Sequence, residues 1–416
     1  MIGAGARLFR NRSFRALWLG QFVSIFGDRL HYLALLALIM ERARDPRNPA
    51  PELALVPAVS FLPTILIAPL AGALVDTWNT RTVLLVSDFI RGCLVLLIIP
   101  AAAHGGLPAA LVLIFLLYVA NSFFLPARSA ILPDLVDPGE LTEANSLATL
   151  AGVAATITGA ALGGILVERA GWRWGFGIDA LTYFVSVGFL AAMRPRRHER
   201  RPRPDTWSGI YTGLAHDVRE GARLTLGNGV VLGSILALVL LWVAGGALHV
   251  AGTVLLRRRM SEFVSGTGGI LSAIGFGMVA GTLLTAWLGR RLPARLSIAA
   301  GLAGTGVMLA LFARAGSFPE LAAVAFVAGI FVALLLVTTE SLVQSAVGPE
   351  ARGRVFALRD FSTRVAVLAA AGCLGVALGR GWLTPEWTVA GAGILLVAAG
   401  VGGMFLWRGA ALPRQQ

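Results

Sequence analysis

The sequence predicts an all-α polytopic membrane protein with twelve transmembrane helices in two sets of six. Hydrophobic residues make up 56% of its 416 positions and charged residues only 14%, whereas roughly a quarter of a soluble globular chain is charged. A hydrocarbon core about 30 Å thick needs roughly 20 apolar helical residues per crossing, and twelve stretches of that kind are present. A strongly basic interruption at 194–203 separates the first six from the last six.

The predicted spans follow one another with short connections. The first six are 14–41, 53–75, 82–103, 108–133, 143–167 and 174–193, and the last six are 229–255, 264–288, 295–313, 319–345, 354–379 and 386–407. Arginines at positions 7, 10, 12 and 15 precede the first span, and no small-residue cleavage site is present. We therefore expect a retained first helix and not a cleaved signal peptide.

Residues 194–228 form the predicted cytoplasmic linker between a first bundle, 1–193, and a second bundle, 229–416. Ile210, Leu214 and Val218 recur every four residues, which is typical of a short helix lying on a membrane surface with its arginines near anionic headgroups. A solvated tether whose charges set the membrane topology is the alternative.

A weak internal repeat relates the two bundles. Gly72, Trp78 and Arg81 recur 209 residues later as glycine, tryptophan and arginine, and Pro138 and Leu147 recur 211 residues later as proline and leucine. Their common order and nearly constant offset favour duplication of a six-helix unit. Parallel repeats of this kind place a substrate cavity between the halves, near the bilayer midplane.

All 35 basic residues are arginines, and their placement indicates membrane topology, not nucleic-acid binding. With a cytoplasmic N-terminus, 20 arginines lie in or beside cytoplasmic segments, 10 in external segments and 5 within spans. An excess of basic residues on the cytoplasmic side is the usual rule. We therefore expect a bacterial cytoplasmic-membrane protein with both termini in the cytoplasm. The run Arg257–Arg259, external in this topology, is the exception.

The chain carries no pattern typical of an enzyme. Cys93 and Cys373 both lie within predicted spans, so neither a disulfide framework nor a multi-cysteine metal site is expected. The sequence has no Walker loop, HExxH motif or nucleophile–base set. We therefore expect no catalytic residues, cofactor or resident metal, and a proton gradient is the default energy source.

Asp28 is the most deeply placed acidic residue of the first half. It lies about 14 residues, or ~21 Å of helix rise, from the start of its span, and His31 and Tyr32 follow on the same helical face. A charged group near the bilayer centre costs at least ~2.5 kcal/mol on insertion scales, so its retention suggests a function. We predict that Asp28, with His31, couples transport to protons; a fixed salt bridge with Arg29 or with an arginine of another helix is the alternative.

Three further charged residues of the first half are expected to have structural roles. Asp88 and Arg91 share one helical face at i and i+3, which favours an ion pair within the span. Asp179 lies early in the sixth span and is expected to be an anchor near the membrane interface.

Three sets of short motifs point to a family. They are Asn11–Gly20 followed by Gly27-Asp28, Gly72–Arg81, and Phe124–Pro133 followed by Leu141–Asn145. In this order they resemble the major facilitator superfamily and, within it, the macrolide-efflux and enterobactin-exporter branch of the drug/proton antiporters. The resemblance covers essentially the whole chain.

Three segments depart from the family pattern. The signature loop, usually Gly-x-x-x-Asp-Arg-x-Gly-Arg-Arg, has Thr77 and Asn79 in place of a basic residue and a glycine. The fifth span keeps the glycines of the antiporter motif in Gly159–Gly164 but lacks its proline, and the fourth span has Asn121 near its middle and no arginine there. These departures bear on proton antiport more than on the fold.

The resemblance implies an exporter of amphipathic small molecules that works by alternating access and proton antiport, its cargo a macrolide-like drug or a siderophore. It also implies that Asp76 faces the start of the eleventh helix when the cytoplasmic side is closed, where a helix N-terminus stabilises a carboxylate. Glu340 is expected to meet Arg81, Arg352 or Arg354. The predicted gate residues are Asp76, Arg81, Glu340, Arg352, Arg354 and Asp360.

Two further sets of residues are predicted to serve transport. Small-xxx-small pairs allow close helix contact, and the resemblance places those of spans five, eight and eleven between the halves: Gly159, Gly163, Gly277, Gly281, Gly375 and Gly379. The predicted cavity wall comprises Phe22, Phe26, Tyr32, Phe115, Tyr118, Asn121, Trp242 and His249.

Other functions stay open at this stage. A lysophospholipid flippase of the same superfamily would need a lateral opening to lipid. A transition-metal exporter resembling ferroportin would use Asp28, His31 and His249. A membrane enzyme or receptor would need a catalytic cluster or a sensory domain. The expected partners are a small amphipathic substrate, protons and membrane lipid, with no nucleic acid, and the protein is expected to be a monomer.

Overall fold

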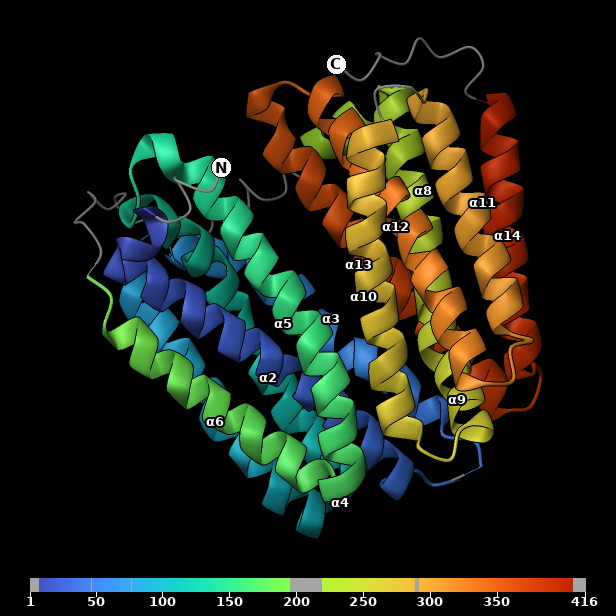
Figure 1. The fold of residues 1–416 in the computed structure, drawn as a ribbon, viewed down its shortest axis with the longest axis horizontal. Coiled ribbons are helices and arrows are strands. Elements are labelled where there is room, and N and C mark those ends of the chain that lie inside the picture. The colour runs from blue at the N-terminus through green and yellow to red at the C-terminus, as the bar shows by residue number, and fades with distance from the viewer. Residues whose placement is uncertain (1–6, 46, 76, 195–218, 289–291, 407–416) are drawn as a thin grey trace. The chain divides into compact units, whose positions relative to one another are not determined.

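The computed structural model describes residues 7–45, 47–75, 77–194, 219–288 and 292–406, and in these ranges the chain is helical, without strands (Figure 1). The first half contains α2 (Arg12–Arg42), α3 (Ala50–Val75), α4 (Thr80–Ile131), α5 (Leu141–Ala170) and α6 (Trp172–Ala191). The second contains α8 (Gly229–Ala247), α9 (Thr253–Arg259), α10 (Phe263–Leu288), α11 (Ala294–Phe312), α12 (Phe318–Ala346), α13 (Pro349–Gly379) and α14 (Pro385–Leu406). The predicted all-α class is confirmed.

The described helices are long and apolar enough for the predicted crossings. Eleven helical stretches could span a membrane, and one of them, Thr80–Asp134, is 55 residues long. At 1.5 Å per residue it would measure ~80 Å, far more than one bilayer. It contains both the third and the fourth predicted spans, and Gly106 within it has a non-helical backbone (φ 70°, ψ −166°). Only glycine adopts this conformation readily, so the chain turns back there.

The seventh predicted span is interrupted. The π-helix η3 (Leu248–Gly252) joins α8 to α9, and the Thr253 hydroxyl donates to the carbonyl oxygen of His249 inside it. Single-turn π segments are frequent at functional sites. His249 therefore lies in a π-helical turn, where the helix is locally wider.

Asparagine side chains cap the N-termini of several helices. Asn11 Oδ1 accepts from the backbone N–H groups of Ser13 (3.0 Å) and Phe14 (3.2 Å) at the start of α2, and Asn79 Oδ1 accepts from Thr82 N at the start of α4. Such caps satisfy N–H groups that have no partner within the helix. Asn79, which departs from the signature loop, therefore has a local structural role.

The helices form two compact units, each with its own packing. The first comprises Met1–Ala43 and Ala58–Ile210, and the second Arg44–Pro57 and Tyr211–Gln416. In the first unit α2 packs on α5 and α6, and α6 packs on α4; in the second α12 packs on α10 and α11, α14 on α11, and α8 on α13 (Figure 1). The predicted surface helix around Ile210, Leu214 and Val218 lies outside the described residues.

The start of α3 belongs to the second unit. Asn48 Nδ2 donates to the Leu378 carbonyl at the end of α13 (2.8 Å), and His249 Nε2 donates to the Leu53 carbonyl (3.1 Å). The predicted cavity residue His249 thus holds the backbone of α3. Its role in the cavity wall stays a prediction.

The small-xxx-small glycines pack inside the units, which corrects part of the prediction. A Cβ at Gly159 would lie 2.8 Å from the Phe26 carbonyl oxygen of α2, and one at Gly281 would lie 2.6 Å from the Ile330 carbonyl oxygen of α12. Gly163 and Gly277 meet the same two helices, while Gly375 and Gly379 face Ala54 and Pro51 of α3. At Gly159, Gly277 and Gly281 the nearest atoms are backbone, so a side chain there would force the helices apart. These three glycines serve packing within a unit, whereas Gly375 and Gly379 meet α3, a helix of the predicted first bundle.

Candidate functional site

The first unit encloses a group of charged and polar side chains contributed by three helices. We call it the buried charge cluster: Asp28 and His31 of α2, Asp88 and Arg91 of α4, and Asp179, Tyr183 and Ser186 of α6. Asp88 and Asp179 are 0% exposed, Arg91 is 2% exposed and His31 is 4% exposed. A buried charge is strongly unfavourable unless it is paired and hydrogen-bonded, so its partners decide what each group can do.

Asp88 and Arg91 form an ion pair within α4, the pairing that their spacing favours. The Ser186 hydroxyl of α6 donates to Asp88 Oδ2 at 2.6 Å, and Arg91 Nη1 donates to Asn121 Oδ1 at 3.1 Å. Asn121 was predicted to line the substrate cavity. Its carbonyl oxygen accepts from the guanidinium of Arg91, so this bond joins the two arms of α4, 80–105 and 107–131, on either side of Gly106. Its place in the cavity wall stays a prediction.

Two aromatic rings complete the environment of Arg91. Its guanidinium carbon lies 4.2 Å from the centre of the Phe124 ring and 4.5 Å from that of Tyr183. A cation between aromatic faces is attracted by their ring quadrupoles, most strongly when water is excluded. Asp88 and Arg91 therefore form a closed, neutralised pair that also joins α4 to α6.

His31 pairs with Asp179, which the sequence did not predict. His31 Nδ1 lies 3.0 Å from Asp179 Oδ2. The expectation that Asp179 anchors the membrane interface is wrong, because the residue is fully buried against α2. His31, predicted to couple protons together with Asp28, has its hydrogen-bond partner on α6, and its coupling role stays a prediction.

Gly27 makes this pairing possible. A Cβ at this position would collide with the Thr182 hydroxyl and lie 2.6 Å from Asp179 Oδ1. The Thr182 hydroxyl itself donates to the carbonyl oxygen of Asp179 at 2.7 Å. The absence of a side chain at Gly27 therefore lets α2 and α6 approach closely enough for His31 and Asp179 to meet.

Asp28 has a different kind of partner. Its Oδ1 accepts a 2.5 Å hydrogen bond from the Tyr183 hydroxyl, and its side chain is only partly buried. No ion pair of Asp28 is present among the described residues. Of the three carboxylates in the cluster, Asp28 is the one with a neutral partner and an exposed side.

The cluster also holds polar atoms without partners. Among the described side chains of the cluster, the buried His31 Nε2, Arg91 Nε and Asp179 Oδ1 form no hydrogen bond. Buried polar groups are usually satisfied by protein or by ordered water, so these are the atoms of the cluster that a water molecule would satisfy. Sequence reasoning missed Tyr183 and Ser186. Their signal was the spacing from Asp179 by four and seven residues, which places all three on one helical face.

The remaining predicted cavity residues come from α2, α4 and α8. Phe22 stacks on Trp18 with ring centres 5.9 Å apart, and Trp242 is 41% exposed. Tyr32 of α2 and Tyr118 of α4 lie close enough to interact electrostatically with each other and with Arg29. The role of these residues in substrate contact stays a prediction.

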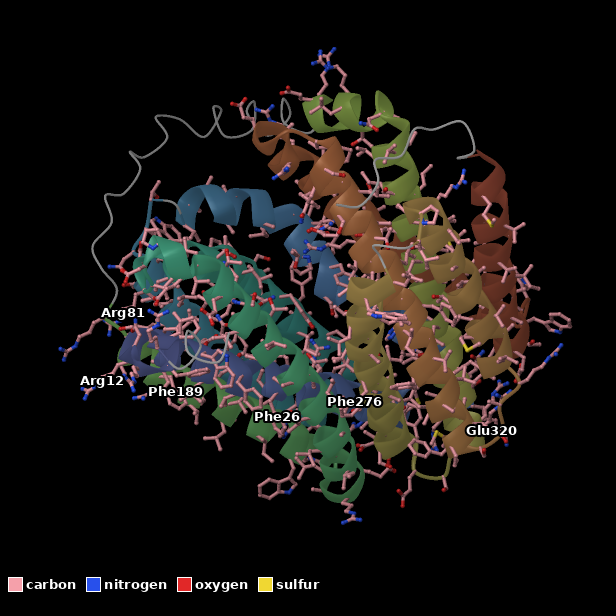
Figure 2. All side chains as sticks on the ribbon, turned by 45° about the horizontal axis from the view of Figure 1, so that its top comes forward. Arg12, Phe26, Arg81, Phe189, Phe276 and Glu320 are labelled. Carbon is pink, nitrogen blue, oxygen red and sulfur yellow. The ribbon has the colours of Figure 1, made fainter. Side chains whose placement is uncertain are left out.

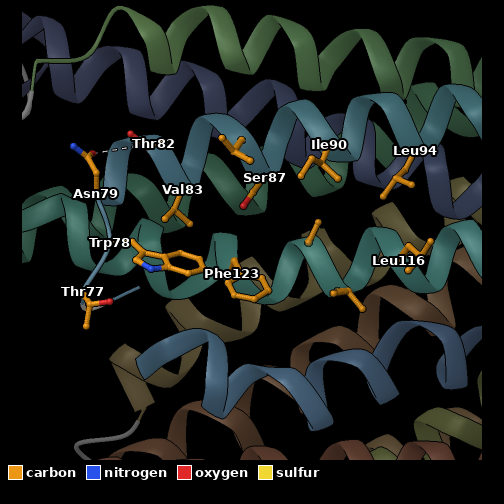
Figure 3. A pocket seen from close by; sticks show the side chains of 13 residues that line it. Thr77, Trp78, Asn79, Thr82, Val83, Ser87, Ile90, Leu94, Leu116 and Phe123 are labelled. Atoms are coloured by element: carbon orange, nitrogen blue, oxygen red, sulfur yellow. Dashed lines mark hydrogen bonds between the residues drawn. The ribbon is translucent and has the colours of Figure 1, made fainter. Parts of the chain in front are cut away.

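A cavity of about 710 Å³ opens between the two arms of α4 instead (Figure 3). At one end Trp78 stacks on Phe123 with ring centres 6.0 Å apart, and Thr77, Asn79 and Thr82 supply hydroxyl and amide groups. Apolar side chains line the rest: Val83, Val86, Ile90, Leu94, Leu116, Val119, Ala120 and Phe123. The volume lies within the ~300–1,000 Å³ typical of ligand sites, and the lining suits an amphipathic molecule.

Two of the six predicted gate residues, Arg81 and Arg352, bind helix ends. Arg81 donates to the carbonyl oxygens of Leu190 and Ala191 at the end of α6, the end that carries Phe189 (Figure 2). Arg352 donates to Val347 O (3.1 Å) and Gln344 O (2.7 Å) at the end of α12. Carbonyls in the last turn of a helix lack partners and attract cations, so both arginines are helix caps here.

The acidic gate residues find other partners than predicted. Glu340 pairs with Arg359, which also lies 2.9 Å from Asp360. The expected pairing of Glu340 with Arg81, Arg352 or Arg354 is therefore corrected. Arg354 instead pairs at 2.5 Å with Glu220, which lies in a helix at 219–226, inside the predicted linker. Asp76 lies outside the described residues.

The metal-exporter alternative gains no support from the described side chains. His31 faces Asp179, Asp28 binds Tyr183, and His249 holds the Leu53 carbonyl. In the described part of the chain, no three His, Cys, Asp or Glu side chains are placed to hold a metal ion.

Comparison with known proteins places this architecture among transporters. The chain is 26% identical over 389 residues to the uncharacterized MFS-type transporter YfiS of Bacillus subtilis, covering 88% of this chain and 87% of that protein. It is 26% identical over 401 residues to the lysophospholipid transporter LplT of Yersinia enterocolitica, covering 89% and 88%.

Solved structures share the fold at low sequence identity. A POT family transporter in complex with 5-aminolevulinic acid has a TM-score of 0.72 at 11% identity, covering 94% of this chain and 96% of the other. A bacterial homolog of the human lysosomal transporter Spinster, inward-facing and unoccupied, has a TM-score of 0.69 at 14% identity, covering 96% of each. At these identities the likeness shows the fold alone.

The family assignment rests on the sequence match together with the helices. Residues 17–266, more than half of the 416, match the Major Facilitator Superfamily. This range includes the signature loop, α4 with its two crossings, and all of the buried charge cluster. The chain is a multi-pass membrane transporter that belongs to the Major Facilitator Superfamily.

Proposed function

We propose that the protein is a proton-coupled secondary transporter of an amphipathic small molecule, with Asp28 as the carboxylate that takes up and releases the proton. It would act as a monomer in the bacterial cytoplasmic membrane, with both termini in the cytoplasm. The observation that carries the proposal is the hydrogen bond between Asp28 and Tyr183, at the exposed edge of an otherwise closed cluster.

The partners of the three carboxylates support this choice. Asp88 is neutralised by Arg91 and Asp179 faces His31, so a change of charge on either would disturb a buried pair. Asp28 binds only a neutral hydroxyl. A protonated Asp28 can keep this hydrogen bond through its remaining carbonyl oxygen, while its exposed side gives the proton a route to water. Asp28 can therefore change charge at the lowest cost in buried interactions.

α4 connects the proton site to the cavity. Ser87 lines the cavity, while the next residue, Asp88, points to Ser186 inside the cluster. A movement of α4 that accompanies substrate binding would shift Asp88 and Arg91, and with them the ring of Tyr183 that holds Asp28. This is a physical route for coupling by a shared rigid element.

Two cargoes are favoured by different observations. The motifs that resemble the macrolide-efflux and enterobactin-exporter branch favour outward movement of a macrolide-like drug or a siderophore. The name of the Yersinia enterocolitica relative favours a lysophospholipid as the second candidate. The cavity between the arms of α4, apolar along most of its length and polar at one end, suits either kind of amphipathic molecule.

Inverted membrane vesicles with an imposed pH gradient test the proposal. Uptake of macrolides, siderophores and lysophospholipids should identify a cargo whose accumulation follows the gradient. Asp28→Asn should abolish this accumulation while retaining exchange of the same cargo at equal pH, because the neutral side chain cannot cycle a proton. Asp45→Asn, an exposed change outside the spans, is the control. Gradient-driven accumulation in Asp28→Asn equal to that of the unchanged protein would refute the coupling role.

A further inference from the structure

Three arginines gather around a second cavity, in the second unit. The cavity measures about 400 Å³ and is lined by Arg47, Pro49, Val254, Arg257 and Arg258. Arg47 belongs to the connection between α2 and α3, whereas Arg257 and Arg258 lie in the last turn of α9. Residues more than 200 positions apart therefore meet through tertiary packing, and local sequence does not account for it.

Side-chain hydrogen bonds hold the backbone on both sides of this cavity. Arg259 Nη1 donates to Ala315 O (2.6 Å) and Phe312 O (3.2 Å), and its Nη2 donates to Ala313 O (2.7 Å), which ties α9 to the end of α11. On the other side, Asn48 Nδ2 is bound to Leu378 O. Arg47 is next to Asn48, and Arg257 lies in the same helix as Arg259. Both arginines therefore belong to segments that hydrogen bonds hold in place.

The three guanidinium groups lack anionic partners. Arg47, Arg257 and Arg258 are exposed, and among the described residues their side chains make no hydrogen bond or ion pair. Asp45 and Glu52 of the same connection accept from the backbone N–H groups of Arg47 and Arg44, and among the described residues neither forms an ion pair with the three guanidinium groups. Three like charges around one cavity repel one another where no ion pair neutralises them, so the arrangement favours a bound anion.

Helix-dipole stabilisation explains only part of this arrangement. Arginines in the last turn of α9 interact favourably with its negative end, but Arg47 is not part of that helix. In the expected topology this end of the second unit is external, where arginines oppose the usual charge rule. Arg259 is accounted for by its three carbonyl contacts. Arg47, Arg257 and Arg258 have no such explanation.

We propose that Arg47, Arg257 and Arg258 form a binding site for a phosphate group, presented by a lipid headgroup or as a free phosphate ion. The planar fork of a guanidinium matches phosphate oxygens in pairs, and a cavity of about 400 Å³ exceeds the size of one phosphate group, leaving space for the rest of a headgroup. The site shares no residue with the buried charge cluster and serves anchoring or recognition at the membrane surface, whatever cargo is transported.

Calorimetric titration of the purified full-length protein in detergent tests the site. One arm uses inorganic phosphate and the other a short-chain phosphatidylglycerol below its micelle concentration. The variant R257Q/R258Q is compared with R314Q/R380Q, which removes two exposed arginines of the second unit that do not line the cavity. Loss of charge-assisted contacts should weaken binding in R257Q/R258Q by roughly tenfold or more, and leave R314Q/R380Q unchanged.

The two arms separate the sources. Arginine-dependent binding of the lipid alone assigns the headgroup, binding of the ion alone assigns free phosphate, and binding of both assigns the phosphate group itself. If R257Q/R258Q does not elute as a folded protein, R47Q on the opposite wall replaces it. Absence of binding in both arms, or equal affinity in R257Q/R258Q and R314Q/R380Q, would overturn the proposal. Transport is not the readout, so failure here leaves the proton-coupling proposal untouched.

Discussion

His31 on α2 and Asp179 on α6 lie 3.0 Å apart, Nδ1 to Oδ2, although 148 residues separate them in the chain. This contact divides the acidic residues of the cluster by role. Asp179 and Asp88 each face a basic side chain, whereas Asp28 faces the Tyr183 hydroxyl. The division leaves Asp28 as the carboxylate that can change charge without disturbing a buried pair.

Gly27→Ala should destabilise the first unit. The new methyl group would collide with the Thr182 hydroxyl and approach Asp179 Oδ1, and overpacking of this kind costs ~1–3 kcal/mol. Gly177→Ala on α6, where a Cβ meets nothing within 4 Å, is the matched control. Thermal unfolding in detergent should show a lowered midpoint for Gly27→Ala, partly restored by adding Thr182→Ala. Equal midpoints for Gly27→Ala and Gly177→Ala would mean that the two helices can separate without loss.

Breaking the Asp88–Arg91 pair should be more damaging than removing both charges. Arg91→Met leaves Asp88 buried without its cation, which costs ~3–5 kcal/mol, while the double variant Asp88→Asn/Arg91→Met removes the uncompensated charge. The yield of monodisperse protein and its unfolding midpoint measure the difference. The pair would not be a closed structural unit if the double variant were as unstable as Arg91→Met.

Arg81→Gln should lower stability without changing substrate affinity. The guanidinium binds two carbonyls at the end of α6, and hydrogen bonds of this kind contribute ~0.5–1.5 kcal/mol each. Arg12→Gln, an exposed arginine at the same end of the unit, is the control (Figure 2). In contrast, Asp76→Asn should change turnover more than equilibrium binding if Asp76 latches the gate. Selective loss of substrate binding in Asp76→Asn would contradict that role.

The orientation in the membrane can be tested with introduced cysteines. In a background with Cys93 and Cys373 replaced by alanine, Ser261→Cys between α9 and α10 should react with an impermeant thiol reagent in intact cells. Ser208→Cys in the predicted linker should be protected, since the arginine distribution places it in the cytoplasm. The reverse pattern would invert the topology, and with it the external position of the arginines around the second cavity.

The sequence by itself determined the class of the fold and the contacts that act over one or two helical turns. Apolar runs of bilayer length predicted the crossings. Lipid offers no hydrogen-bond partner to backbone N–H and C=O groups, so an apolar run that crosses the membrane forms a helix, which pairs these groups internally. The spacing of Asp88 and Arg91 predicted their ion pair, because residues three apart lie next to each other on the surface of one helix. Even the turn at Gly106 falls between the third and fourth predicted spans.

Only the tertiary structure decided which side chains of different helices, or of distant parts of one helix, pair with each other. His31 pairs with Asp179, Asn121 with Arg91 and Glu340 with Arg359, because helix packing brings these side chains together. Close approach at Gly27 and the convergence of Arg47 with Arg257 depend on segments far apart in the chain. Periodicity assigns a residue to a face of its own helix, but the neighbour of that face is set by packing across the whole unit.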